Sequence, residues 1–74
     1  MTRTEVAATV TGSVWEVLVS VGDTVEAGDD ILIAEAMKME IGIASSVSGK
    51  VVALLVENGA EIEEGATVAV IEGA

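Results

Sequence analysis

The amino-acid sequence predicts an all-β fold, a flattened β-barrel or sandwich of two thin antiparallel sheets related by a pseudo-twofold axis. Three observations support this prediction. Apolar residues make up 51% of the chain and aromatic residues only 1%, so Val, Ile, Leu and Ala must form the core, and β-branched residues favour strands. No stretch repeats apolar residues at the helical period over about ten positions. Finally, the second half of the chain repeats the first after 37 residues.

The repeat is visible when residues 10–35 are aligned with residues 47–72. Identical residues coincide at Val10/Val47, Gly12/Gly49, Val14/Val51, Leu18/Leu55, Val19/Val56, Gly22/Gly59, Glu26/Glu63, Gly28/Gly65 and Glu35/Glu72. Such a half is too small to bury its own apolar face, so the halves are expected to close on each other around a common core. We therefore interpret residues 1–74 as one domain built from two half-repeats of about 37 residues.

Each half predicts the same order of elements. A glycine, Gly12 or Gly49, is interpreted as a turn before a strand with alternating apolar residues. Two glycine-marked turns then flank one aliphatic residue, Val25 or Ile62, which we expect to be buried. A second short strand follows. The turn regions are residues 21–30 and 58–67, and the second strands are residues 31–36 and 68–73. The pattern predicts about eight strands and no helix, with the glycines at positions of positive φ.

The alternation also predicts the core. In the first half it assigns Val14, Val17, Val19, Ile31 and Ile33, with their partners 37 positions later. We expect Trp15 to serve packing as well, and a position near a partner surface is the alternative. Lys50 follows a glycine at the start of a strand and is interpreted as a solvent-facing charge.

The centre of the chain predicts a tight hairpin. Between the strands at residues 31–36 and 39–44 only Met37 and Lys38 remain, so these two residues should form the tip. Neither is Gly, Asn or Asp, the residues that such turns favour, and the turn is therefore expected to be strained. Strain at a turn is a reason to suspect a function.

Composition excludes several functions. The chain has no Cys and no His, which excludes disulfides, thiol or imidazole catalysis and the usual zinc sites, so most catalysis is excluded and no metal site is predicted. A net charge of −10 disfavours nucleic acid and anionic membranes. The longest apolar run, residues 51–56, is far shorter than the ~20 residues of a membrane span, and residues 1–10 lack the apolar core of a signal peptide. A soluble, cytoplasmic protein is expected.

The segment EAMKME, Glu35 to Glu40, resembles the biotin-attachment motif of the biotinyl/lipoyl domain family, whose core is Ala-Met-Lys-Met with the lysine at a hairpin tip. Residues 12–31 and 48–72 are similar to the two halves of that family's domain, so the resemblance covers nearly the whole chain. Lipoyl carriers usually show Asp-Lys-Ala at this place. The chain is similar to the small free-standing biotin carboxyl carriers (biotin/lipoyl attachment proteins), and the implied fold is a barrel-sandwich hybrid.

The resemblance implies a role for each residue of the motif. A biotin protein ligase would join biotin to Lys38, with Ala36, Met37 and Met39 as the motif flanks. Glu35 and Glu40 are candidates for recognition by the ligase, with ordinary surface charge as the alternative. The tethered biotin would carry a carboxyl group from a biotin carboxylase to a carboxyltransferase acting on an acyl-CoA, as in the acetyl-CoA carboxylase of fatty acid biosynthesis. The carrier itself would be a non-catalytic monomer.

Two alternatives stay open from the sequence. The first is a lipoyl carrier of an oxo-acid dehydrogenase or of the glycine-cleavage system, and the second is an unmodified acidic β-domain that only binds protein. The chain also departs from the family at Gly42, where many biotin carriers have a proline.

Overall fold

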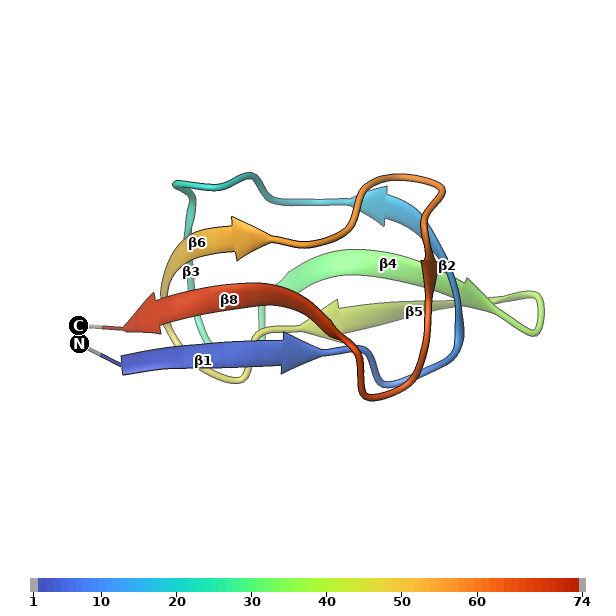
Figure 1. The fold of residues 1–74 in the computed structure, drawn as a ribbon, viewed down its shortest axis with the longest axis horizontal. Coiled ribbons are helices and arrows are strands. Elements are labelled where there is room, and N and C mark those ends of the chain that lie inside the picture. The colour runs from blue at the N-terminus through green and yellow to red at the C-terminus, as the bar shows by residue number, and fades with distance from the viewer. Residues whose placement is uncertain (1, 74) are drawn as a thin grey trace.

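The computed structural model describes residues 2–73, which form eight strands in two antiparallel four-stranded sheets and no helix (Figure 1). The strands are β1 (Thr2–Ala7), β2 (Gly12–Val17), β3 (Thr24–Val25), β4 (Asp30–Ala36), β5 (Met39–Ala44), β6 (Gly49–Leu54), β7 (Glu61–Ile62) and β8 (Thr67–Gly73). The two ends of the predicted domain, Met1 and Ala74, lie outside the described residues. No helix in the described part of the chain could cross a membrane. The predicted all-β fold of two thin sheets is confirmed, and the sheets do not close into one barrel.

The sequence repeat returns as a repeat of strands. β1 to β4 recur as β5 to β8, and each strand begins and ends 37 residues after its counterpart. The sheet orders, β1-β8-β6-β3 and β5-β4-β2-β7, exchange when the halves are exchanged, as a pseudo-twofold axis requires. Each sheet therefore contains strands from both halves, so neither half forms a sheet of its own.

Loops fasten each half to the other with the same hydrogen bonds. The N–H of Gly22 donates to the carbonyl of Val51, and the N–H of Gly59 donates to the carbonyl of Val14, both at 2.8 Å. Positive φ values occur at the glycines of the predicted turn regions, as expected. These glycines are Gly22, Gly28, Gly59 and Gly65.

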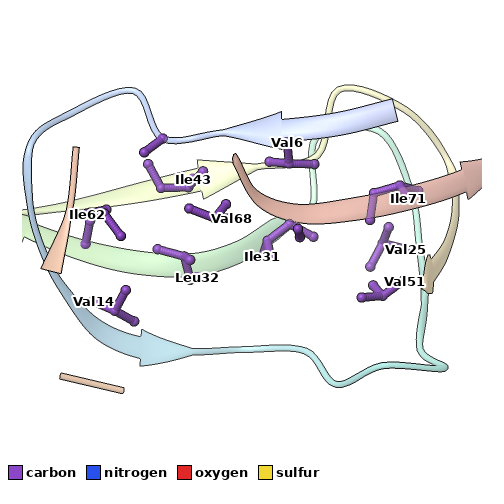
Figure 2. Close-up of a cluster of buried hydrophobic side chains, with 13 residues drawn as sticks. Val6, Val14, Val25, Ile31, Leu32, Ile43, Val51, Ile62, Val68 and Ile71 are labelled. Atoms are coloured by element: carbon purple, nitrogen blue, oxygen red, sulfur yellow. The ribbon is translucent and has the colours of Figure 1, made fainter. Parts of the chain in front are cut away.

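The core lies between the two sheets and draws equally on both halves (Figure 2). Val25 and Ile62, the single aliphatic residues of the two turn regions, are both buried, as predicted. The other buried apolar residues are Val6, Ala8, Val14, Ile31, Leu32, Ala34, Ile43, Val51, Val68, Ala69 and Ile71. Val17 and Val19 are partly buried and pack against this cluster.

Strict alternation gives a wrong prediction for one part of the core. Ile33 is only partly exposed, but it and its partner Val70 lie outside the core cluster. The cause is a β-bulge in β4. Asp30 pairs with Ala44 and Leu32 pairs with Ile43 in β5, which leaves Ile31 without a partner, and Ile31 and Leu32 are both buried. Beyond the bulge the alternation has the opposite phase, which turns Ile33 away from the core.

The packing expected of Trp15 is not in the core, because Trp15 is 53% exposed. Alternation after the buried Val14 already points Trp15 outward. A bulge follows in β2, since Val14 pairs with Ala34 and Glu16 pairs with Ile33, and it leaves Glu16 exposed as well and returns Val17 to the side of the core.

Gly12 and Gly49 also differ from the prediction. They are the first residues of β2 and β6 and not part of a preceding turn, and positive φ is not the reason for a glycine at these positions. A Cβ on Gly12 would collide with the backbone carbonyl oxygen of Glu35, and a Cβ on Gly49 with that of Glu72. The two glycines therefore allow β2 and β6 to approach β4 and β8 closely.

We expect Gly12→Ala and Gly49→Ala each to lower the free energy of unfolding by roughly 1–3 kcal/mol, because a backbone atom cannot move aside as a side chain can. Gly73→Ala is the control, since its Cβ would meet its nearest atom at 3.5 Å, and we expect a change below about 0.5 kcal/mol. Denaturant unfolding measures all three. Equal stability of Gly12→Ala and the parent would contradict the close approach.

Candidate functional site

The hairpin between β4 and β5 has the predicted two-residue tip. Ala36 pairs with Met39, and the turn between them consists of Met37 and Lys38, with φ values of 52° and 65°. Positive φ at both central residues is the geometry of a type I′ turn, whose twist matches that of the strands. The tip projects from one end of the molecule, and the pair of Thr2 and Gly73 lies at the opposite end (Figure 1).

The turn is strained, as its residue types predict. Within residues 2–73, Met37 and Lys38 are the non-glycine residues with positive φ. The left-handed conformation costs such residues roughly 1–2 kcal/mol each. Core packing does not explain their choice, because Met37 is 95% exposed and the neighbouring Met39 is 63% exposed. Residues that are strained and exposed at one tip indicate selection for a function.

Lys38 is accessible to another molecule. It is exposed, and the ion pair found in residues 2–73 joins Arg3 and Glu72 at 3.0 Å, at the far end of the fold. A covalent attachment through an amide requires a lysine amine that an enzyme can reach, and Lys38 meets this requirement.

Glu35 and Glu40 face each other across the hairpin, directly below the pair that carries the turn. Like charges on directly opposite residues are destabilising, so stability does not explain this pair. The row continues across the sheet, since Ser13 pairs with both Glu35 and Glu61. These four residues, Glu40, Glu35, Ser13 and Glu61, form what we call the acidic row.

The equivalent row of the other sheet has the opposite character. Arg3 and Lys50 both pair with Glu72, and Thr24 pairs with Lys50. Two of the three basic residues of the chain thus lie in this row, and the third is Lys38. The pseudo-twofold axis relates the two rows position by position, but the rows differ in charge. Because Glu35 and Glu40 lie directly below the turn, the lysine at the tip adjoins the acidic row.

Ser13 and Glu61 belong to this site but were not predicted from the sequence. Ser13 comes from the first half and Glu61 from the second, and only the pairing of β2 with β7 brings them together. The repeat contains an indication of their importance, because the two halves differ in residue type at these positions. The counterpart of Ser13 is Lys50, and the counterpart of Glu61 is Thr24.

Gly42 lies in β5 and pairs with Ile33 in β4. A Cβ at this position would lie 2.6 Å from Oδ1 of Asp30, but this carboxylate ends an exposed, flexible side chain that can move aside, so the structure does not explain the glycine.

Comparison with known proteins identifies the family. Residues 1–71 match the biotin/lipoyl family, described as biotin-requiring enzyme. The chain is 42% identical over 67 residues to the biotinylated protein TB7.3 homolog of Mycobacterium leprae, covering 90% of this chain and 94% of that protein. It is 46% identical over 61 residues to the urea amidolyase of Saccharomyces cerevisiae, covering 82% of this chain but only 3% of the relative.

Two solved structures share the fold. The urea carboxylase of Kluyveromyces lactis gives a TM-score of 0.90 at 42% identity, covering 97% of this chain and 6% of the larger one. A single-chain, multi-domain long-chain acyl-CoA carboxylase gives a TM-score of 0.85 at 29% identity, covering 92% of this chain and 7% of the other. The chain therefore belongs to the family of biotin-requiring enzymes, within which it is a non-catalytic biotin carrier domain.

Proposed function

We propose that biotin is attached to Lys38 and that the chain carries carboxyl groups between a biotin carboxylase and a carboxyltransferase. The observation that supports this proposal is the hairpin tip, where strained and exposed Met37 and Lys38 present one amine beyond the rest of the fold. Ala36, Met37 and Met39 serve as the flanks that place this amine for a biotin protein ligase. When bound, biotin supplies a ureido nitrogen that accepts and releases a carboxyl group.

The chain's own residues perform two tasks. In attachment, the neutral amine of Lys38 attacks the acyl carbon of biotinyl-adenylate, an amide bond forms, AMP leaves and one proton is released. In transfer, the sheet below the turn fixes the direction of the tether, which keeps the prosthetic group at a high effective concentration for two separate enzymes. We propose that the isolated carrier is a monomer.

We expect ligase, biotin and ATP to add one biotin to the parent chain and none to Lys38→Arg. Arginine preserves the charge but offers no amine for the amide bond. Lys50→Arg is the control and should be modified like the parent, because Lys50 lies in the opposite sheet. Intact mass and peptide mapping measure the result and also separate biotin from lipoate. Biotin found on Lys50 would disprove the assignment, and no modification of the parent would disprove the function.

Exchanging Met37 and Lys38 tests the position of the amine. The double substitution Met37→Lys, Lys38→Met preserves composition, charge and two side chains at positive φ. We expect a folded protein whose biotinylation is slower by on the order of 100-fold, because small displacements of a reacting atom cost that much in rate. Circular dichroism checks the fold and single-turnover kinetics give the rate. An unchanged rate would show that the ligase reads the sequence and not the turn.

We propose that Glu35 and Glu40 attract a basic surface of the ligase. Substitution by Gln should lower kcat/KM for biotinylation by about 2- to 5-fold each at low salt, since exposed charge pairs contribute roughly 0.2–1 kcal/mol. The difference from the parent should shrink as added salt screens the charges. Glu72→Gln, the counterpart of Glu35 in the other sheet, should have no effect on kcat/KM. Equal losses for Glu35→Gln and Glu72→Gln would contradict recognition through the acidic row.

For the acceptor of the carboxyl group we propose an acyl-CoA, with acetyl-CoA first. The similarity to a long-chain acyl-CoA carboxylase supports this class, and the similarity to urea amidolyase and urea carboxylase favours urea as the second candidate. Streptavidin should isolate the carrier from its native host with its carboxylase. We expect this complex to transfer radiolabelled carboxyl from bicarbonate to an acyl-CoA in the presence of ATP. Transfer to urea alone would replace the proposed acceptor.

A further inference from the structure

An open groove of about 790 Å³ lies at the base of the hairpin, formed by segments from both halves of the chain. Its lining includes Ser13 from β2, Ala36 and Met37 from the hairpin, and Glu61 and Ile62 from β7. The groove therefore reaches the turn at Met37 and extends from there to β2 and β7. None of the residues so far assigned to attachment requires such a groove.

The groove lies at a place where the two halves differ in side-chain size and charge. Ser13, with its short side chain, occupies the place that Lys50 occupies in the other half, and Glu61 occupies the place of Thr24. A lysine at position 13 would put a long cationic side chain at the rim. The small residue keeps the groove open on the side of the hairpin.

The polar groups of the groove are available to a ligand. Within residues 2–73, neither the hydroxyl of Ser13 nor the carboxylate of Glu61 forms a side-chain hydrogen bond, although the neighbouring hydroxyl of Thr11 accepts one from the N–H of Glu64 at 3.0 Å. A hydroxyl can donate to a carbonyl and a carboxylate accepts from N–H groups. Ala36, which is partly exposed, and Met37, which is 95% exposed, add apolar surface at the hairpin side of the groove.

This combination matches the chemistry of a bicyclic ureido ring, which has one carbonyl oxygen, two N–H groups and an apolar thioether side. The tether begins close by, because Met37 lines the groove and adjacent Cα atoms are only about 3.8 Å apart. We propose that the groove holds the ring of biotin attached to Lys38 while the carrier is between enzymes. This inference rests on the proposed attachment, and it assigns Ser13 and Glu61 to binding of the ring.

Amide NMR spectra of the apo protein and of the protein biotinylated at Lys38 test the proposal. We expect biotinylation to shift the resonances of Ser13, Glu61 and Ile62 in addition to those of the hairpin. Nuclear Overhauser effects between ring protons and the side-chain protons of Ser13 and Glu61 should be present in the same sample. Shifts confined to residues 35–40, with no such effects, would overturn the proposal.

Ser13→Lys provides the matched variant, because the other half of the fold already carries lysine at this position in its strand. Prolonged incubation with the ligase should load it with one biotin at Lys38, although the added cation in the acidic row should slow that reaction, and the loaded variant should lose the shifts at Glu61 and Ile62. Ser46→Lys is the control, since Ser46 is exposed beyond β5 at the end remote from the hairpin and receives the same change of charge. Retained shifts in Ser13→Lys would contradict the groove. A parent chain that takes up no biotin would instead disprove the proposed function.

Discussion

Neither half of this chain can bury its apolar face alone, and the fold is the way in which two such halves cover each other. Each sheet takes strands from both halves, and each half supplies the loop that hydrogen-bonds a strand of the other. The core between the sheets consequently forms only when residues from the two ends of the sequence meet. A chain of 74 residues without disulfides or aromatic clusters depends on this mutual burial for a rigid scaffold.

Rigidity at the core permits strain at the tip. Met37 and Lys38 would not remain in the left-handed conformation in a free peptide, because each costs roughly 1–2 kcal/mol there. The pairing of Ala36 with Met39 and of Glu35 with Glu40 imposes the turn, and β4 is itself fixed between β5 and β2. The lysine therefore leaves the domain in a direction set by the sheet, which a carrier serving several enzymes needs.

Departures from the pseudo-twofold symmetry mark the functional end. The backbone repeats strand for strand, yet the row with Arg3 and Lys50 corresponds to a row of three carboxylates and Ser13 beside the hairpin. Gene duplication alone would leave the two ends alike in charge. The proposed recognition by a basic enzyme surface rests on the acidic row, and the proposed site for the ring rests on the groove beside the small Ser13, so both proposals depend on the same asymmetry.

The sequence by itself determined the all-β class, the repeat, the two-residue tip and the identity of its lysine, because turn chemistry and apolar periodicity act between near neighbours. Tertiary structure alone decided the bulges that returned Val17 to the core side of β2 and turned Ile33 from the core, and it decided why position 12 is occupied by glycine. It also brought Ser13 and Glu61 together. These features depend on the register between strands that are distant in the chain. A linear pattern does not specify which residues of such distant strands will face each other.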